Sequence, residues 1–280
     1  MRLVPVCLAL LTAIPASRPP LALTADQIAR QVRDRDTGRD SRAELRMKLF
    51  DRRGRARERA LTLLTLRGRQ APGAPETAPD GDRLLIRFTY PNDIRGTAFL
   101  VWKHPKGEDE RFLFLPSLGR VRRIAGSEAQ ESFVGSDFSY EDIGGRDFDD
   151  YSYALLDENA SWSGPDRAPH PAYRLESRRK DRSVEFPRVV SLVLKDTFLV
   201  IQADIFNRRD EKQKVYAVKR VEQIQRIWTV MESSMSNDLE QTRTELVVEK
   251  TEYNTGVTED AFSRRALEAA SRPRGGATPE

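Results

Sequence analysis

The feature that most constrains this chain is a long succession of short apolar runs, most of them with a period of two. In the first run, Leu45, Met47 and Leu49 alternate with Arg46 and Lys48, as in a strand with one face in water. The candidate strands are residues 41–49, 60–66, 84–89, 97–103, 112–115, 151–156, 172–177, 189–194, 199–206, 215–221, 227–235 and 242–253. With little helical pattern among them, they predict a mainly β fold, in which one meandering antiparallel sheet curls around its apolar face.

Two of these strands are apolar on both faces. In residues 97–103, Leu100 and Trp102 alternate with Phe99 and Val101, and residues 112–115 repeat the pattern. Strands of this kind are buried on both sides or line a cavity. Packing in a core is the simplest explanation of their aromatic rings, and lining a lipid cavity is the alternative.

Helical patterns flank the strands. Thr24 and Gln27 have the spacing of a capping box, and Ile28 and Val32 then recur one turn apart, which predicts a helix to about residue 36. Thr258 begins a second predicted helix, which continues through about residue 270 before a proline. We expect one domain over residues 25–270 and a disordered tail over residues 271–280.

The first 24 residues have the layout of a secretory signal peptide. Arg2 precedes an apolar run over residues 3–14, which is too short to span a bilayer, and small residues and prolines follow. This pattern predicts export to the periplasm, with cleavage near residues 22–25. Cys7 is the one cysteine, so an exported chain would carry no thiol. A lipid anchor on Cys7 and an apolar tail on a cytosolic protein are the alternatives.

The charge balance argues against nucleic acid as a partner. The formal net charge is +4, from 47 basic and 43 acidic residues, and removal of Arg2 and Arg18 leaves 45 − 43 = +2. Nucleic-acid modules concentrate a surplus of Lys and Arg on one face. We therefore expect no nucleic-acid partner.

The chain shows no catalytic constellation. His104 and His170 both stand next to prolines, without a second ligand at helical spacing. No G-x-S-x-G nucleophile elbow is present in the sequence. We therefore expect no enzymatic activity, no cofactor and no metal site.

One acidic run is the strongest candidate for chemistry. It contains Asp137, Glu141, Asp142, Asp147, Asp149 and Asp150, interrupted by two glycines. These carboxylates could wrap a hard cation, although they lack the spacing of a calcium loop. More simply, they could pair with Arg120, Arg122, Arg123 and Arg146 or lie in water. The arginine cluster could in turn bind a phosphate or lipid headgroup, or hold the acidic loop.

Three ordered blocks resemble a known family. They are GTAFLVW at residues 96–102, FLFLPSLGRVRRIAGS at residues 112–127 and SFVGSDFSYEDI at residues 132–143. The blocks are similar to the core of the outer membrane lipoprotein-sorting proteins, relatives of the carriers LolA and LolB. The resemblance implies an incomplete β-barrel with an N-terminal helix and short lid helices around an apolar cavity. It also implies a non-catalytic periplasmic carrier that moves the acyl chains of a lipoprotein or lipid toward the outer membrane.

Alternation along the strands, not the resemblance, suggests which residues would contact such a cargo. The predicted cavity lining is Ile28, Val32, Phe88, Val101, Phe112, Phe114, Phe133 and Phe138, and the predicted rim for a headgroup is Arg120, Arg122 and Arg123. An inner-membrane transporter or an outer-membrane acceptor is the expected protein partner.

Two other functions stay open. One is an accessory subunit that docks a lipid-exporting envelope transporter and carries no cargo. The other is an envelope hydrolase that uses a carboxylate pair from the acidic run.

Overall fold

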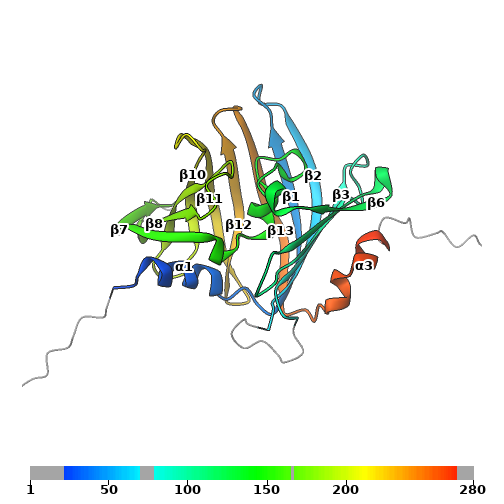
Figure 1. Cartoon of the computed structure of the whole chain (residues 1–280), viewed down its shortest axis with the longest axis horizontal. Helices are drawn as coiled ribbons and strands as arrows, with labels where there is room; N and C mark the ends of the chain where they lie inside the picture. The colour runs from blue at the N-terminus through cyan, green and yellow to red at the C-terminus, as the bar shows by residue number, and fades with distance from the viewer. Residues whose placement is uncertain (1–21, 70–78, 165–166, 270–280) are drawn as a thin grey trace, which may run out of the picture.

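The structure is a computed structural model that describes residues 22–69, 79–164 and 167–269 (Figure 1). The predicted leader up to residue 21 and the predicted tail lie outside these residues. The strands are β1 (Asp40–Phe50), β2 (Ala56–Leu66), β3 (Arg83–Tyr90), β4 (Ala98–Trp102), β5 (Glu110–Leu115), β6 (Arg120–Ile124), β7 (Tyr151–Ser163), β8 (Pro169–Arg179), β9 (Arg188–Leu194), β10 (Val200–Phe206), β11 (Lys212–Ile224), β12 (Ile227–Asn237) and β13 (Thr242–Tyr253). The α-helices are α1 (Ala25–Asp34), α2 (Tyr140–Gly144) and α3 (Arg264–Ala269). The 3-10 helices are η1 (Pro116–Leu118), η2 (Gly126–Glu128), η3 (Phe133–Gly135), η4 (Phe148–Asp150) and η5 (Glu259–Phe262).

All thirteen strands form one antiparallel sheet in the order β6-β5-β4-β3-β2-β1-β13-β12-β11-β10-β9-β8-β7. Every pair except one joins strands that follow each other in the chain. The exception is β1 with β13, which places Ser41 opposite Tyr253 and Phe50 opposite Arg243. The predicted mainly β fold, a curved sheet that stays open as an incomplete barrel, is confirmed.

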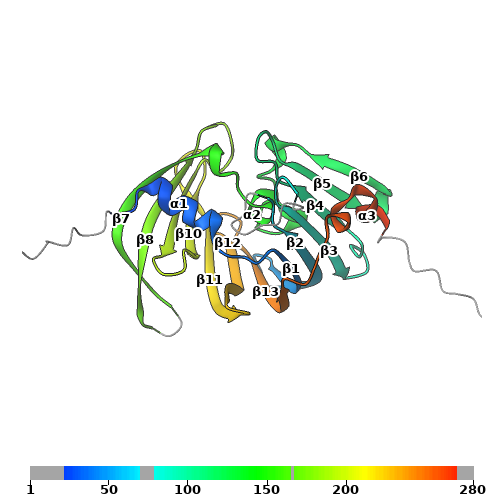
Figure 2. The ribbon, with the colours of Figure 1, turned by 90° about the horizontal axis from the view of Figure 1, so that it is seen from below.

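The sheet bends into a trough whose two walls are β1–β6 and β7–β12 (Figure 2). Its edge strands, β6 and β7, are joined by residues 125–150, here called the crossing segment, which contains η2, η3, α2 and η4. We call the face of the sheet that the crossing segment contacts the inner face, and the opposite face the outer face. The hairpin turns β1–β2, β10–β11 and β12–β13 lie at the upper end of the trough in Figure 1, and α1 lies at the lower end.

Local sequence signals account for the first helix and the first hairpin. Thr24 and Gln27 form the predicted capping box, in which the Thr24 hydroxyl accepts from the Gln27 N–H and the Gln27 amide oxygen accepts from the Thr24 N–H. In the β1–β2 turn, the Asp51 carboxylate accepts from the Arg55 N–H at 3.0 Å, and Gly54 has a φ of +74°. A glycine adopts that left-handed conformation without strain, so the turn closes in register.

Two predicted elements differ from the structure. Residues 120–124, which are rich in arginine, form strand β6, which we did not predict from their charge. The segment can be a strand because it lies at the edge of the sheet, where polar side chains are tolerated on both faces. The predicted C-terminal helix is divided into η5 and α3, because Ser263 between them is extended, with φ −79° and ψ 154°.

This C-terminal piece covers the outer face of β3–β5. Val257, Phe262 and Leu267 pack against a cluster that includes Leu100 and Phe112. The Trp102 indole N–H donates to the Phe262 carbonyl at 2.7 Å. The outer face of this wall is thus buried under the chain's own end.

Candidate lipid-binding site

The inner face of the β1–β6 wall is apolar, and the crossing segment inserts aromatic rings into it. The Phe133 ring lies 5.8 Å from Phe88 and 5.4 Å from Phe99, between ring centroids, and Tyr140 lies 5.3 Å from Phe99. All four side chains are buried in one cluster with Val101. In this structure, the crossing segment itself fills the space over this wall.

The apolar lining continues across the trough. A second cluster joins Phe138 of the crossing segment to Phe186 and Met235, and Ile143 and Leu246 pack against both this cluster and the first. A third cluster joins α1 to β8 and β9, and it meets the second at Val200. A chain of apolar contacts therefore runs from one wall to the other.

The structure divides the predicted cavity residues among four clusters. Phe88, Val101 and Phe133 lie in the first inner cluster, and Phe138 lies in the second. Ile28 and Val32 lie in the third, at the lower end of the trough. The single interior that we expected is therefore three connected clusters, and contact of these six residues with an acyl chain stays a prediction.

Phe112 and Phe114 do not join the other six. They pack in the outer cluster under η5 and α3, with Leu85, Ala98 and Leu100. Side chains alternate across a strand, and both faces of β4 and β5 are apolar, so alternation alone could not tell which face is inner. The prediction that these two rings share one interior with Val101 is therefore wrong.

The predicted arginine rim is also divided. Arg120, Arg122 and Arg123 are all exposed on β6. Arg122 lies opposite Leu113, on the inner face, whereas Arg123 lies opposite Phe112, on the outer face. Arg122 forms an ion pair with Glu128 of η2. These arginines therefore do not converge on one anion.

Asp137 attaches the crossing segment to β13. Its carboxylate accepts hydrogen bonds from the hydroxyls of Thr242 and Thr244, and its backbone N–H donates to the Thr244 hydroxyl at 3.0 Å. Its carbonyl accepts from the Lys214 ammonium at 3.1 Å. Asp137 and Thr244 are both buried, so these bonds form away from bulk water, where they are strongest.

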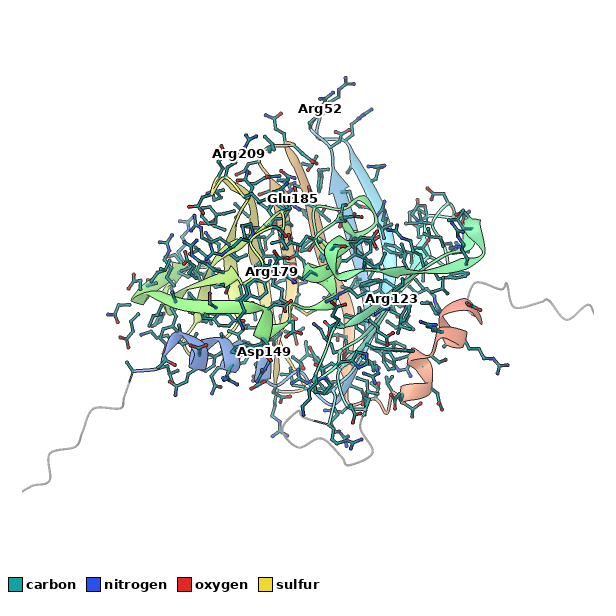
Figure 3. The ribbon with its side chains drawn as sticks, in the orientation of Figure 1. Arg52, Arg123, Asp149, Arg179, Glu185 and Arg209 are labelled. Atoms are coloured by element: carbon teal, nitrogen blue, oxygen red, sulfur yellow. The ribbon has the colours of Figure 1, made fainter. Side chains whose placement is uncertain are left out.

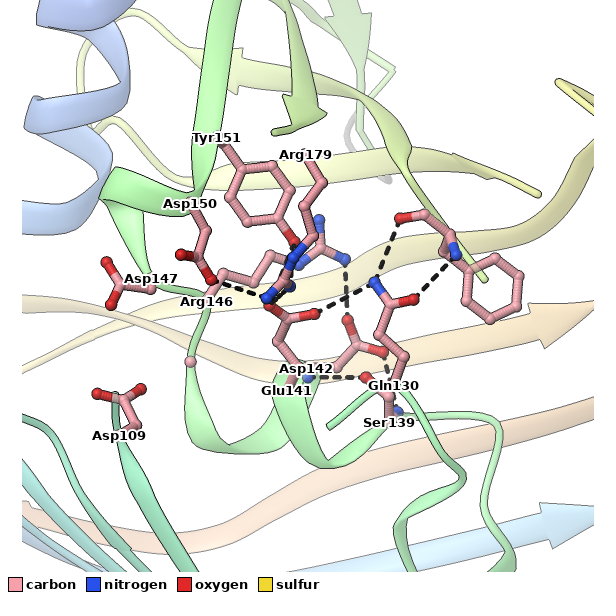
Figure 4. Close-up of polar contacts among 12 residues, drawn as sticks. Asp109, Gln130, Ser139, Glu141, Asp142, Arg146, Asp147, Asp150, Tyr151 and Arg179 are labelled. Atoms are coloured by element: carbon pink, nitrogen blue, oxygen red, sulfur yellow. Dashed lines mark hydrogen bonds and ion pairs between the residues drawn. The ribbon is translucent and has the colours of Figure 1, made fainter. Parts of the chain in front are cut away.

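Glu141 attaches α2 to the β7–β12 wall, and Asp142 stabilises α2 within the crossing segment (Figure 4). Glu141 is buried and accepts from the Arg179 guanidinium and from the Tyr151 hydroxyl. Asp142 pairs with Arg146 at 2.9 Å and forms a capping box with Ser139. Burial raises the pKa of the Asp142 carboxyl, but Arg146 and the Ser139 N–H outweigh that effect, so this pKa lies below its ordinary value.

At Gly144 and Gly145, the backbone of the crossing segment lies directly against side chains of β4 and of the residue that follows it. A Cβ at Gly144 would meet the Val101 side chain at 3.2 Å, a tight contact, and Gly145 has a φ of +87°. The Lys103 ammonium donates to the Gly145 carbonyl at 2.6 Å. The two glycines of the acidic run thus serve packing and a turn.

Val134 is held in a conformation that β-branched residues avoid. Its φ is +50° and its ψ is 38°. Its carbonyl accepts from the Arg59 guanidinium of β2 at 2.5 Å. Backbone strain of this kind persists where surrounding contacts over-determine it, and it gathers at functional sites.

The acidic run is thus bonded largely within the protein. Pairing with Arg146 was predicted, but Arg179, which pairs with Glu141 and Asp150, was missed, because it is distant in sequence and no local signal points to it. Within the described ranges, no three His, Cys, Asp or Glu side chains converge as metal ligands would.

A polar cavity of about 470 Å³ opens at the upper end of the trough, between the crossing segment and the hairpin turns. Figure 3 labels Glu185 on its wall and Arg52 and Arg209 on the nearby turns. A much smaller cavity next to it is lined by Glu141, Asp142 and Lys214 among others. Burial raises the pKa of Asp150, as a general acid requires, but Asp150 lines neither of these two cavities, and Asp142, which lines the smaller one, has a lowered pKa.

Comparison with known proteins agrees with this architecture. The model of a family described as "Uncharacterized protein" matches residues 80–269. A DUF1329 family protein from Desulfovibrio piger ATCC 29098 is 29% identical, with a TM-score of 0.75, over 87% of this chain and 97% of that one. An outer membrane lipoprotein-sorting protein domain from Vibrio parahaemolyticus is 26% identical, with a TM-score of 0.75, over 87% and 98%. No curated protein matches the chain at a significant level.

The fold is also shared more distantly. A LolA superfamily protein from Nitrosomonas europaea is 17% identical, with a TM-score of 0.65, over 88% of this chain and all of that one. The chain therefore belongs to the family whose model it matches, and it shares the fold of the LolA superfamily protein. Within the described residues, no helix has the length and apolar character needed to cross a membrane.

Proposed function

We propose that this protein is a non-catalytic periplasmic carrier that binds the acyl chains of a lipoprotein or lipid and moves them toward the outer membrane. The observation that carries the proposal is the continuous apolar lining of the inner face, which the crossing segment covers. The similarity to a lipoprotein-sorting domain supports it. Each CH₂ moved out of water is worth about 0.8 kcal/mol, so a carrier needs such an apolar sleeve.

The cargo site would be the space that the crossing segment now fills. Phe133, Phe138 and Tyr140 are buried in the inner clusters, and an acyl chain could replace these rings at a small net cost in apolar burial. The other contacts that fasten the segment are polar and directional, so water can satisfy the same groups once the segment moves away. Loading would therefore exchange one apolar cover for another.

A reversible cross-link tests this site. The chain's one cysteine, Cys7, precedes the described residues, so an engineered pair would be unique in a chain that starts after the leader. We would introduce Asp137→Cys with Thr244→Cys, because these side chains already meet. The reduced form should take up a fluorescent fatty-acyl probe, whereas the oxidised form, with its crossing segment locked, should not.

Native mass spectrometry of the protein, purified from a periplasm without detergent, gives the complementary measurement. Co-purified acyl species in stoichiometric amount are expected. A protein that carries no lipid and takes up no probe in its reduced form would contradict the carrier proposal and favour the docking subunit. Equal uptake by the locked and reduced forms would place the cargo elsewhere.

A further inference from the structure

The polar cavity at the upper end of the trough is built differently from the apolar clusters next to it. Its walls come from the ends of β1, β2, β11, β12 and β13, from the β8–β9 connection and from residues 130–137 of the crossing segment. Amide and hydroxyl groups of Gln213, Asn237, Thr242 and Thr244 line it. The cavity adjoins the second inner cluster, because Phe186 belongs to both. A molecule with a polar end and an apolar chain would find both environments side by side.

Lys214 is a buried cation in the wall of this cavity, with an exposed fraction of 7%. Its ammonium donates to the Asp137 carbonyl and lies 4.5 Å above the Phe186 ring. Across the described chain, no carboxylate lies at ion-pair distance from it, and the Asp137 carboxylate is bonded to the two threonine hydroxyls instead. An ammonium has three donors and a buried charge normally has a counter-ion, so Lys214 can accept an anion from a ligand.

The mouth of the cavity has the opposite charge. Glu131, Glu185 and Glu240 line it, all three are exposed, and none forms an ion pair within the described residues. By contrast, the Asp51 carboxylate on the same wall is paired with Arg55. The exposed guanidinium of Arg57 on β2 also lines the cavity and forms no ion pair within the described residues, but the three free carboxylates outnumber it, so a purely anionic ligand would meet net repulsion there. A ligand with its anion at Lys214 and a cation outside it would satisfy both charges.

We propose that this cavity binds a zwitterionic headgroup, a phosphate ester that carries a primary amine. The phosphate lies at Lys214, the amine faces Glu185 and Glu240, and the attached acyl chain enters the inner clusters past Phe186. None of these four residues belongs to the crossing segment, so they keep their places when that segment moves on loading. This inference rests on the proposed carrier function, because it assigns the headgroup of the same cargo.

Three lysolipids with one acyl chain in common test the headgroup separately from the chain. They are lysophosphatidylethanolamine, which is zwitterionic, lysophosphatidylglycerol, which is anionic, and a neutral monoacylglycerol. A charge-assisted hydrogen bond to a desolvated group is worth enough to give at least about a tenfold difference in Kd. We expect the zwitterionic lipid to bind at least about tenfold more tightly than the neutral one, with the anionic lipid between them.

Variants assign the two charges. Lys214→Met should lower the affinity for the zwitterionic lipid to that for the neutral one, and it should leave the affinity for the neutral lipid unchanged. Lys214→Arg should keep the preference for the zwitterionic lipid. Lys219→Met is the matched control, because Lys219 is an exposed lysine on the same strand that pairs with Glu245 outside the cavity. The double variant Glu185→Gln and Glu240→Gln should bind the zwitterionic lipid more weakly than the wild-type protein does. Its affinity for that lipid should equal its affinity for the anionic one.

The outcomes separate this inference from the carrier proposal. Equal affinity of the wild-type protein for all three lipids would overturn the headgroup site and leave the carrier standing. A preference that survives Lys214→Met would overturn the assignment of the anion to this residue. No binding of any of the three would contradict the carrier function itself.

Discussion

The two faces of β4 and β5 are similarly apolar, yet their covers are fastened in different ways. On the outer face, the C-terminal piece packs Val257, Phe262 and Leu267 directly into the cluster. On the inner face, the crossing segment also buries aromatic rings, but Asp137 and Glu141 fasten it to other strands through polar bonds. Both covers combine apolar packing with polar bonds, since the Trp102 indole also donates to the outer cover, but the inner cover depends more on buried charged groups. Water can satisfy those groups and an acyl chain can replace the buried rings, so the inner cover is the one suited to exchange.

The largest expected effect is on the outer face. Phe112 has an exposed fraction of 1% and packs edge-on against Trp102. Phe112→Ala should lower the free energy of unfolding by about 3–5 kcal/mol, because it leaves a cavity in a packed cluster. Urea denaturation measures this, and uptake of an acyl probe per folded molecule should stay unchanged.

Phe99→Ala is the matched change on the inner face, where it should cost similar stability and also alter acyl uptake. If Phe112→Ala impaired uptake as strongly as Phe99→Ala, the proposed difference between the two faces would be lost.

The next effect concerns the ion pair that holds α2. Arg179→Met leaves the buried Glu141 carboxylate without its guanidinium, which should cost about 3 kcal/mol. Hydrogen exchange should quicken in residues 129–150 and stay the same in residues 257–267. Arg188→Met is the control, because Arg188 is equally buried but pairs with Glu176 and Asp210. If Arg179→Met quickened hydrogen exchange equally in residues 129–150 and 257–267, the two covers would not be held independently.

A smaller effect depends on pH. The pKa of Asp142 is lowered in the folded state, so its stabilisation is complete above its unfolded pKa of about 4 and is lost as the pH falls through the lower, folded value. The raised pKa of Asp150 acts in the opposite direction, because protonation of this carboxyl favours the folded state. The hydrogen-exchange protection factors of residues 139–146, which correct for the intrinsic rate at each pH, should therefore fall below about pH 4, and Asp142→Asn should remove most of that fall. An unchanged pH profile in Asp142→Asn would show that another group is responsible.

The smallest effect tests the strain at Val134. Val134→Gly and Val134→Ala both remove the branched side chain, but only glycine accepts a φ of +50° without cost. The glycine variant should be more stable than the alanine variant by about 1 kcal/mol, as measured by thermal denaturation. Equal stability of the two would show that the positive φ carries no strain.

Twelve of the strands and the first helix were predictable because their signals are local, whereas the basic edge strand β6 was missed. A period of two identifies most of these strands, and the Thr24 capping box identifies the start of α1. The aromatic residues of the candidate site were also recognisable. Their division between faces was not, because Phe99 and Phe112 lie in strands that are apolar on both sides.

Local signals were enough to specify a large antiparallel sheet, since alternation and turn residues act over a few positions. Which face of that sheet is the inner one does not follow from such signals. That choice depends on contacts between distant residues, such as the pairing of β1 with β13 and the bond between Glu141 and Arg179. Such contacts are selected by the burial and satisfaction of the whole molecule, and no short stretch of sequence contains them.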